Sequence, residues 1–186
     1  AVYLSELLQQ GWKFYLRYLM VGIILLFAIP LIKTALPIYA PQKYVQFAKE
    51  KKPFSEHTWE DGEKHPISQD FADMLGWKEL ASKVDSIYLA IADKNHTLIL
   101  CDNYGQAGAI NYYSKIADLK ADSFNTDYEN WINLNKEIKN VIRVKSYENL
   151  NSTRDFSLFS SVKLSTKVEN PFARENGTQI IILSQP

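Results

Sequence analysis

The side chains best suited to binding a ligand stand together directly after a short apolar run in the middle of the chain. They are Asp102, Asn103, Tyr104 and Gln106. The run at residues 98–101 predicts a buried strand, and the residues from Gln106 to Lys115 predict a helix. In open α/β sheets, ligands bind where a strand ends and a helix begins, because the helix N-terminus offers unpaired N–H groups. The alternative is that Asp102 and Asn103 only cap the helix while Tyr104 packs.

Several other chemistries lack their signature in this sequence. Neither G-x-G-x-x-G nor G-x-x-x-x-G-K-[ST] is present, so a nucleotide-binding fold is not supported, and the absence of G-x-S-x-G leaves a hydrolase without support. The 21 basic and 21 acidic residues cancel, which gives no field for nucleic acid. The single cysteine, Cys101, lies in the apolar run and is expected to be a buried, inert thiol.

A polar stretch between Pro53 and Pro66 holds residue types that bind metals. They are His57, Glu60, Asp61, Glu63 and His65, with Trp59 among them. Their spacing matches no strong ligand signature, so we interpret the stretch as a solvated loop. The sequence therefore predicts neither a metal nor a cofactor.

The remaining patterns predict an α/β fold with a small mixed sheet flanked by helices. The clearest helix is Trp77–Ile91, where apolar residues recur with helical period. Shorter helices are expected at Gln42–Lys52 and Ser68–Leu75, and strands at Asn140–Lys145, Asp155–Leu164 and Thr178–Leu183. The polar stretch Ala117–Lys139 predicts irregular structure anchored by Tyr128 and Trp131.

Residues Phe14 to Ile32 form a nineteen-residue apolar segment in which Arg17 is the only charge. A helix of this length crosses the hydrocarbon layer, so we predict a transmembrane helix with its flanks over 1–40 and an extracytoplasmic α/β domain over 41–186. A buried helix and a signal peptide are the alternatives. Basic residues flank the segment on both sides, so local charge does not decide its orientation. The chain begins with Ala1 in helical sequence, and we expect it to be the C-terminal piece of a longer protein.

Four motifs, taken in order, resemble a known family. They are LPIYAP at 36–41, QDFADMLGWKELASKV at 69–84, DNYGQAGAINYY at 102–113 and NPFARENGTQI at 170–180. Together they resemble the C-terminal part of bacterial polytopic glycosyltransferases (GT-C type) of the protein-mannosyltransferase and aminoarabinose-transferase kind. A further family segment, Ser-x-His-x-x-Tyr-x-x-Trp, is matched at Ser123, Tyr128 and Trp131, but Asn125 stands at the histidine position.

The resemblance implies an enzyme of the bacterial inner membrane that transfers a sugar from a polyprenyl-phosphate carrier to an acceptor on the outer, periplasmic side. The family's catalytic acidic residue lies in an N-terminal loop outside this chain, so no residue here is expected to be catalytic. The present chain would be the last membrane helix and an accessory soluble domain, with the bilayer, the missing N-terminal membrane region and the lipid-linked donor as partners. Candidate substrate-binding residues are Asn103, Tyr104, Gln106, Tyr128 and Glu175.

A second hypothesis from another class is a membrane-anchored, non-catalytic binding module. The sequence upstream of Ala1 separates the two: further hydrophobic spans and an acidic outer loop favour the enzyme, whereas a start codon shortly before Ala1 favours the module.

Overall fold

The computed structural model describes residue 11 and residues 13–36, 38–50, 57–135, 137–146, 156 and 159–185. By its internal contacts the chain divides into two compact units, Ala1–Phe71 and Ala72–Pro186, and each is described by itself. The predicted boundary between residues 40 and 41 separates a membrane segment from an extracytoplasmic domain. The division by internal contacts does not test it, so it stays a prediction.

The first unit begins with α2, a 23-residue helix spanning Lys13–Ala35. Where its side chains are described, most of them are exposed, and the exposed ones from Leu19 to Phe27 are nearly all large and apolar. Pro30, which can terminate a helix at its C-terminal side, lies within the helix. Across the described residues, no helix satisfies both the length and the apolarity that a membrane crossing requires.

The rest of the first unit contains a helix, a small hairpin and the start of a short helical turn. Helix α3 (Pro41–Glu50) places Tyr44 against Phe71, with ring centroids 5.8 Å apart. Strands β1 (His57–Thr58) and β2 (Lys64–His65) pair antiparallel, and α4 (Gln69–Ala72) follows. The solvated loop expected between Pro53 and Pro66 therefore contains a hairpin, which its two-residue strands are too short to reveal as a pattern.

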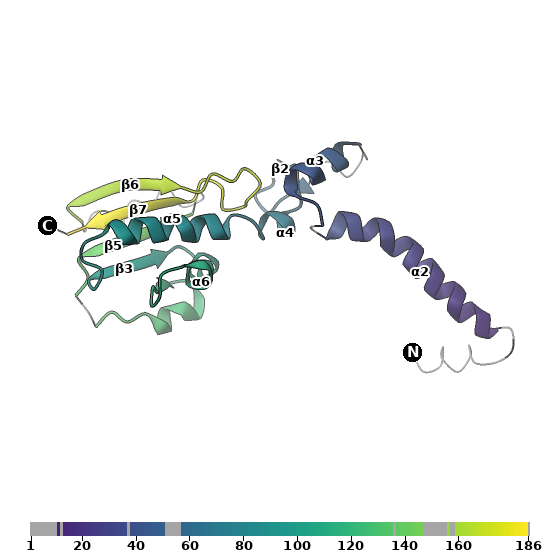
Figure 1. The fold of residues 1–186 in the computed structure, drawn as a ribbon, viewed down its shortest axis with the longest axis horizontal. Helices are drawn as coiled ribbons and strands as arrows, with labels where there is room; N and C mark the ends of the chain where they lie inside the picture. Colours follow the sequence, from purple (N-terminus) through teal and green to yellow (C-terminus); the bar gives the residue numbers. More distant parts are fainter. Residues whose placement is uncertain are drawn as a thin grey trace. The chain divides into compact units, whose positions relative to one another are not determined.

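The second unit is built on a five-stranded mixed sheet in the order β4-β3-β5-β7-β6 (Figure 1). The strands are β3 (Thr97–Cys101), β4 (Ala121–Ser123), β5 (Asn140–Lys145), β6 (Ser161–Lys167) and β7 (Gln179–Ser184). Strands β4, β3 and β5 run parallel, whereas β7 is antiparallel to both β5 and β6. The prediction of a mixed α/β sheet flanked by helices is confirmed.

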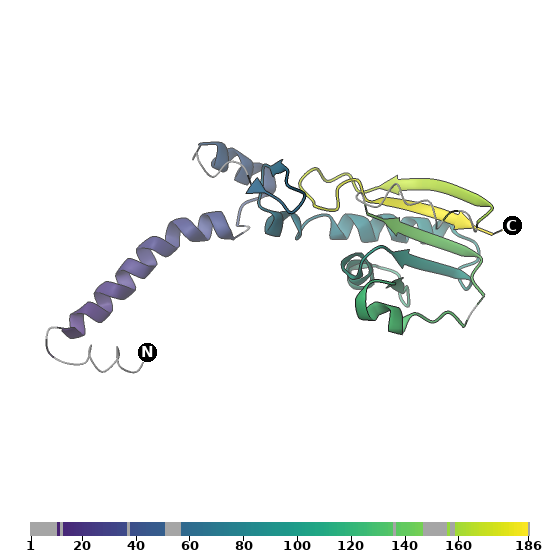
Figure 2. The ribbon, with the colours of Figure 1, turned by 180° about the vertical axis from the view of Figure 1, so that it is seen from behind.

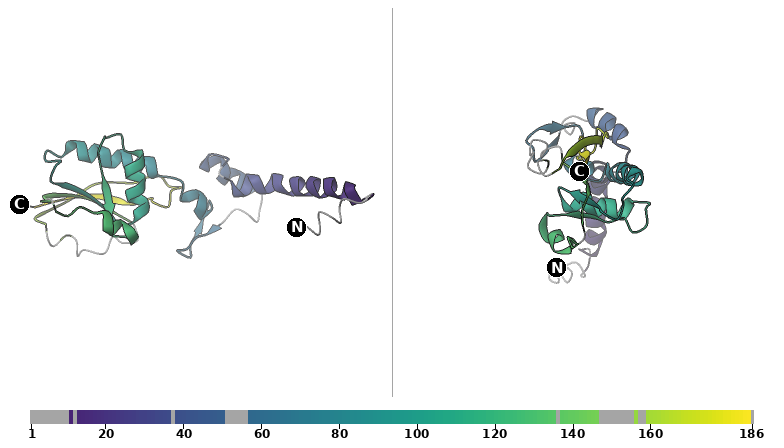
Figure 3. Two further views of the ribbon diagram at one scale, coloured as in Figure 1. Left: turned by 90° about the horizontal axis from the view of Figure 1, so that it is seen from below. Right: turned by 90° about the vertical axis from the view of Figure 1, so that its left-hand side faces the viewer.

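Two helices cover one face of this sheet. Helix α5 (Trp77–Ala90) and α6 (Tyr104–Tyr113) lie on the face turned away from the viewer in Figure 2, and the layers are seen from the side in Figure 3. The main core joins Leu80 and Val84 of α5 to Ile110 of α6 and to Ile99 and Ile142 of the sheet. The opposite face holds a smaller cluster around Leu98, Val141, Ile181 and Leu183, with Phe156 and Phe159 packed against it.

Most predicted elements of the second unit lie where the sequence indicates; the exceptions are the stretch 117–139 and the strand expected from Asp155. Strand β4 and the 3-10 helix η1 (Thr126–Trp131) fall in the stretch 117–139 that was expected to be irregular. Strand β6 begins six residues later than the expected start at Asp155, and part of that expected strand, including residues 157–158, lies outside the described residues. Strand β3, helix α6 and the parallel strand β4 form a βαβ unit, of which the sequence predicted the first strand and the helix.

Candidate functional site at the carboxyl ends of β3 and β5

An ion pair between Asp102 and Arg143 marks the carboxyl ends of the two central parallel strands. The Arg143 guanidinium contacts the Asp102 carboxylate, and both side chains are about nine-tenths buried, at 11% and 7% exposed. Arg143 also donates to the carbonyl oxygens of Leu100 and Val144, each at 3.2 Å. The second Asp102 oxygen accepts the backbone N–H of Ser146 at 2.8 Å. Either charge alone would be costly to bury, so the two side chains stay paired. The ion pair and its hydrogen bonds therefore hold the end of β3 against β5.

The next residues cap helix α6 and extend the same network. The Asn103 side chain accepts the backbone N–H of Gln106 at 2.8 Å, as a helix N-cap does. The fully buried Gln106 side chain accepts from the Asp102 N–H at 3.1 Å and donates to the Ser146 hydroxyl at 2.9 Å. Three of the four residues singled out after the central strand therefore have structural partners.

Glu175 joins this network from a distant part of the sequence. One of its carboxylate oxygens accepts from the Gln106 amide at 2.8 Å and from the Thr178 hydroxyl at 2.7 Å. We call the set formed by Asp102, Asn103, Gln106, Arg143, Ser146, Glu175 and Thr178 the polar junction. The structure thus brings together Asn103, Gln106 and Glu175, which the sequence could only nominate separately.

The loop that carries Glu175 is held by its own turns and by a close approach to the start of α5. Gly76 has a φ of +86°, and a Cβ built there would lie 2.9 Å from the Ala173 Cβ and 3.9 Å from the Glu175 Cβ. Arg174 donates its backbone N–H to the Ala72 carbonyl at 3.3 Å, and its guanidinium lies 3.5 Å from the Asp73 carboxylate. Only glycine combines this backbone conformation with so near a neighbour, which explains Gly76 in physical terms.

The two tyrosines of the predicted site lie outside the polar junction. Tyr104 begins α6 and is 55% exposed. Tyr128 lies on η1, where its hydroxyl is 3.5 Å from the position of a Cβ on Gly108, and its ring lies 5.0 Å from that of Trp131. The predicted site therefore divides into a polar group within the fold and two tyrosines, of which Tyr104 is exposed and Tyr128 is half-buried against the main core.

Sequence reasoning missed Arg143, Ser146 and Thr178. Arg143 had a readable signal, because a charged residue in the middle of the apolar strand NVIRVK needs a partner if that strand is central. Ser146 and Thr178 gave none, since small hydroxyl residues at strand ends are common wherever turns begin.

The polar junction has the chemistry of a structural joint rather than of a reaction centre. Among the described residues, no buried side-chain nitrogen or oxygen lacks a hydrogen-bond partner. The neighbouring Cys101 is fully enclosed, and burial raises the pKa of its thiol far above the ordinary value, so that it is no nucleophile. No side chain of the junction combines a free nucleophile with a nearby base.

A second cluster, in the first unit, gathers potential metal ligands. The ligand atoms of Asp61, Glu63 and His65 lie within 4.8 Å of one another. The His65 ring stacks on Trp59 at 3.5 Å between centroids and hydrogen-bonds to the Asp61 carboxylate at 2.9 Å. Both carboxylates are exposed, and such groups commonly gather without an ion. The nearby His57 bonds to the Tyr44 hydroxyl at 3.2 Å, and burial lowers the pKa of that imidazole.

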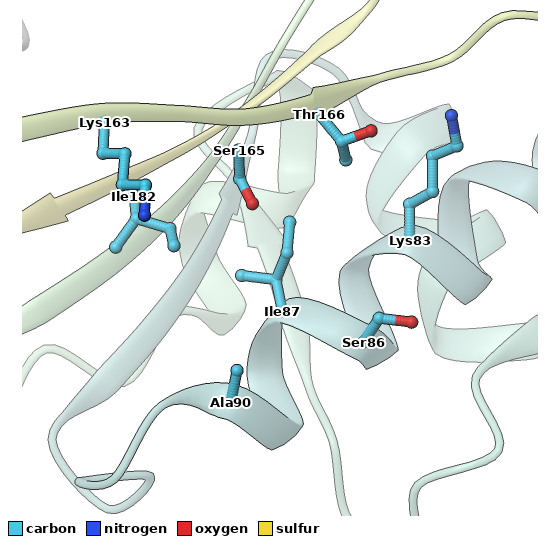
Figure 4. Close-up of a pocket in the computed structure, with 8 residues that line it drawn as sticks. All are labelled: Lys83, Ser86, Ile87, Ala90, Lys163, Ser165, Thr166 and Ile182. Atoms are coloured by element: carbon cyan, nitrogen blue, oxygen red, sulfur yellow. The ribbon is translucent and has the colours of Figure 1, made fainter.

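An open hollow of about 420 Å³ lies between α5 and β6, away from the polar junction (Figure 4). Ile87 lines its middle, Lys163 and Ile182 lie at one end in this view, and Lys83 lies at the other. The Lys83 ammonium is already bound to the Lys167 carbonyl and to the carboxylates of Glu79 and Glu169. The hollow therefore contains none of the predicted site residues, and one of its two cations is neutralised.

Comparison of the chain with family models, with curated proteins and with solved structures finds no match.

Proposed function

We propose that this chain is the C-terminal part of a bacterial membrane glycosyltransferase, with an accessory domain that lies outside the cytoplasm. The parent enzyme would transfer a sugar from a polyprenyl-phosphate carrier to an acceptor at the outer face of the membrane. The observation that carries the proposal is the convergence of three of the four family-like motifs at one end of the second unit.

The convergence is made of direct contacts between the motifs. The motif at 69–84 meets the one at 170–180 where Gly76 approaches Ala173, and the one at 102–113 where the Trp77 ring lies 3.6 Å from the Cβ position of Gly105. The motifs at 102–113 and 170–180 meet in the hydrogen bond between Gln106 and Glu175. The three motifs therefore pack against one another, as the parts of one family-specific site are expected to do.

The membrane span is part of the same proposal. The sequence of Phe14–Ile32, nineteen residues in which Arg17 is the only charge, supports this part of the proposal, whereas among the described residues no helix is found that is long and apolar enough to cross a membrane. Large apolar side chains exposed along α2 are costly in water and stable in lipid. The parent enzyme needs such a position, since the carrier's tail stays in the bilayer while its phosphate and sugar reach the surface.

Within the parent enzyme, the domain would present an acceptor or close the site rather than perform the transfer. The polar junction supports this division, because its polar groups are all used to hold strands, helix and loop together. The same saturation is what a non-catalytic, membrane-anchored module would show. A membrane-anchored binding module therefore stays the alternative proposal, and the sequence upstream of Ala1 distinguishes it from a glycosyltransferase.

The test is the transfer activity of the full-length protein on a polyprenyl-phosphate sugar, with and without the residues after Pro41. We expect the truncated enzyme to insert into the membrane but to lose transfer or acceptor affinity. Unchanged transfer and unchanged affinity would show that the domain takes no direct part in the reaction.

A further inference from the structure

The exposed aromatic side chains of the second unit are confined to one stretch of it. Among the described residues of this unit, the exposed aromatics are Tyr104, Tyr112, Tyr113, Phe124 and Trp131. All of them belong to α6 or to the segment from β4 to η1. Tyr112 is 80% exposed and Trp131 60%, so folding buries little of either ring. Rings left in water on one side only are typical of an interaction surface.

Three of these aromatic residues, Tyr104, Tyr112 and Trp131, form a row along α6 together with Tyr128, which is half-buried and packs against the main core. Tyr104, Gly108 and Tyr112 are spaced four residues apart, which places them on one face of the helix. Gly108 has no side chain, and the Tyr128 hydroxyl lies over it, 3.5 Å from the Cβ position. Trp131 packs beside Tyr128 with ring centroids 5.0 Å apart. We call Tyr104, Tyr112, Tyr128 and Trp131 the aromatic row; its ends are about 12 Å apart along the helix axis.

The backbone beneath the row is firmly held. The Asn111 amide donates to the Ala121 carbonyl at 2.9 Å and accepts the Ala121 N–H at 2.7 Å, which ties α6 to β4. The Lys120 ammonium donates to the Trp131 carbonyl at 2.8 Å, which ties the end of η1 to the residue before β4. The rings are therefore presented by a fixed scaffold, and a ligand need not order them first.

The surroundings of the row are polar, rich in amides and not basic. Exposed asparagines in this segment are Asn125, Asn130, Asn133 and Asn135. The exposed charges near the row balance: Lys115, Lys120 and Lys78, whose ammonium lies 5.6 Å from the Tyr113 ring, stand against Asp118, Asp127 and Glu129. Without an excess of positive charge, the surface does not favour phosphate backbones or anionic lipid headgroups. Aromatic faces and amides without net charge instead fit a ligand with apolar C–H faces and many neutral hydroxyls.

We infer that the aromatic row binds a neutral, extended oligosaccharide. The polarised C–H groups of a sugar ring lie against the electron-rich face of a tyrosine or tryptophan, and amide side chains bond to the hydroxyls around the edge. A row about 12 Å long accommodates roughly two or three pyranose rings. The inference deepens the proposed function and rests on it, since a glycosyltransferase domain would work beside such a chain.

The test titrates the whole chain, held in nanodiscs of neutral lipid, with two soluble probes, chitotetraose and mannotetraose. Binding is followed by calorimetry and by the part of the tryptophan fluorescence change that Trp131→Ala removes. We expect Tyr112→Ala and Trp131→Ala each to weaken binding about fivefold or more, while Tyr112→Phe keeps the ring and the affinity. The matched control is Leu89→Ala on α5, a residue that is 61% exposed and outside the row; it is expected to change nothing.

Three outcomes overturn the inference. They are no binding of either probe by the unsubstituted chain, an equal loss in Leu89→Ala, and insertion of Trp131 into lipid in place of sugar binding. Insertion would be seen as fluorescence quenching by brominated lipid that Trp131→Ala removes. Circular dichroism of each variant confirms that it folds. The proposed function is judged separately by transfer in the full-length enzyme: if Tyr112→Ala abolishes sugar binding but leaves transfer intact, the glycan site stands and acceptor presentation fails.

Discussion

The two sides of helix α6 use their residues in opposite ways. On the inner side, Gln106 is fully buried and bonds to Asp102, Ser146 and Glu175 in the polar junction. On the outer side, Tyr104 and Tyr112 of the aromatic row expose most of their surface. The buried amide is thus used by the fold, whereas the tyrosines on the other side remain accessible to a partner. Residue type alone does not separate the two groups, because the sequence nominates Tyr104 and Gln106 alike.

The comparison predicts that substitutions in the polar junction reduce stability, whereas substitutions in the aromatic row reduce binding. For each variant below, the free energy of unfolding is measured by urea titration of the chain in neutral-lipid nanodiscs, with circular dichroism as the signal.

The largest expected effect is that of Arg143→Met. It removes one partner of a buried ion pair and leaves the Asp102 carboxylate without its counter-charge, which costs about 3–5 kcal/mol of unfolding free energy. Removing both charges in Arg143→Met/Asp102→Asn is expected to restore much of the loss. The exposed Lys163→Met is the control and should change stability by less than about 0.5 kcal/mol. A small loss in Arg143→Met would mean that the ion pair does not hold β3 to β5.

The next effect is that of Gly76→Ala, for which we expect a loss of about 2–3 kcal/mol. The new Cβ meets the Ala173 Cβ at 2.9 Å, and alanine is strained at a φ of +86°. The double variant Gly76→Ala/Ala173→Gly relieves the contact but keeps the backbone strain, so it should recover part of the stability. If the double variant is no more stable than the single one, the approach of the 170–177 loop is not what requires glycine.

A smaller loss, about 1–2 kcal/mol, is expected from Glu175→Ala, because the Gln106 amide and the Thr178 hydroxyl lose their shared acceptor. Glu175→Gln keeps an acceptor oxygen and should cost less. The exposed Glu169→Ala tests whether losing a carboxylate from the same strand-to-loop region matters in itself. Equal losses in Glu175→Ala and Glu175→Gln would point to charge rather than to the two hydrogen bonds.

The smallest effect on stability is that of Tyr112→Ala, below about 0.5 kcal/mol, because a side chain that is 80% exposed contributes little burial. A loss as large as that of Glu175→Ala would show that the aromatic row is part of the fold, and the contrast between the two sides of α6 would disappear.

Local patterns predicted the elements that are long or strongly apolar. Helix α5 is found at Trp77–Ala90 against an expected Trp77–Ile91, and β5 has the bounds that its pattern indicates. The turn after β3 is capped by Asn103, one of the two caps that the sequence offered. These agreements follow from hydrophobic periodicity and from capping chemistry, both of which act over a few residues.

Short elements escaped the same reasoning. Strand β4 is the three residues Ala-Asp-Ser, all buried, and only its parallel register with β3 makes it a strand. The hairpin of β1 and β2 likewise exists through pairing, with His57 opposite His65. Strand β6 is an edge strand whose register shifts between Leu164 and Thr166, so its apolar alternation is weak.

The sequence by itself determined the class of the fold, the central strand with its capped helix, and the five residues from which a site was expected. Only the tertiary structure decided that Asn103, Gln106 and Glu175 are one hydrogen-bonded network closed by Arg143, and that the exposed Tyr104 and the half-buried Tyr128 belong to a separate aromatic row. The reason is physical: periodicity and caps are written in neighbouring residues, whereas burial and partners depend on strand order and on loops that meet across the sheet.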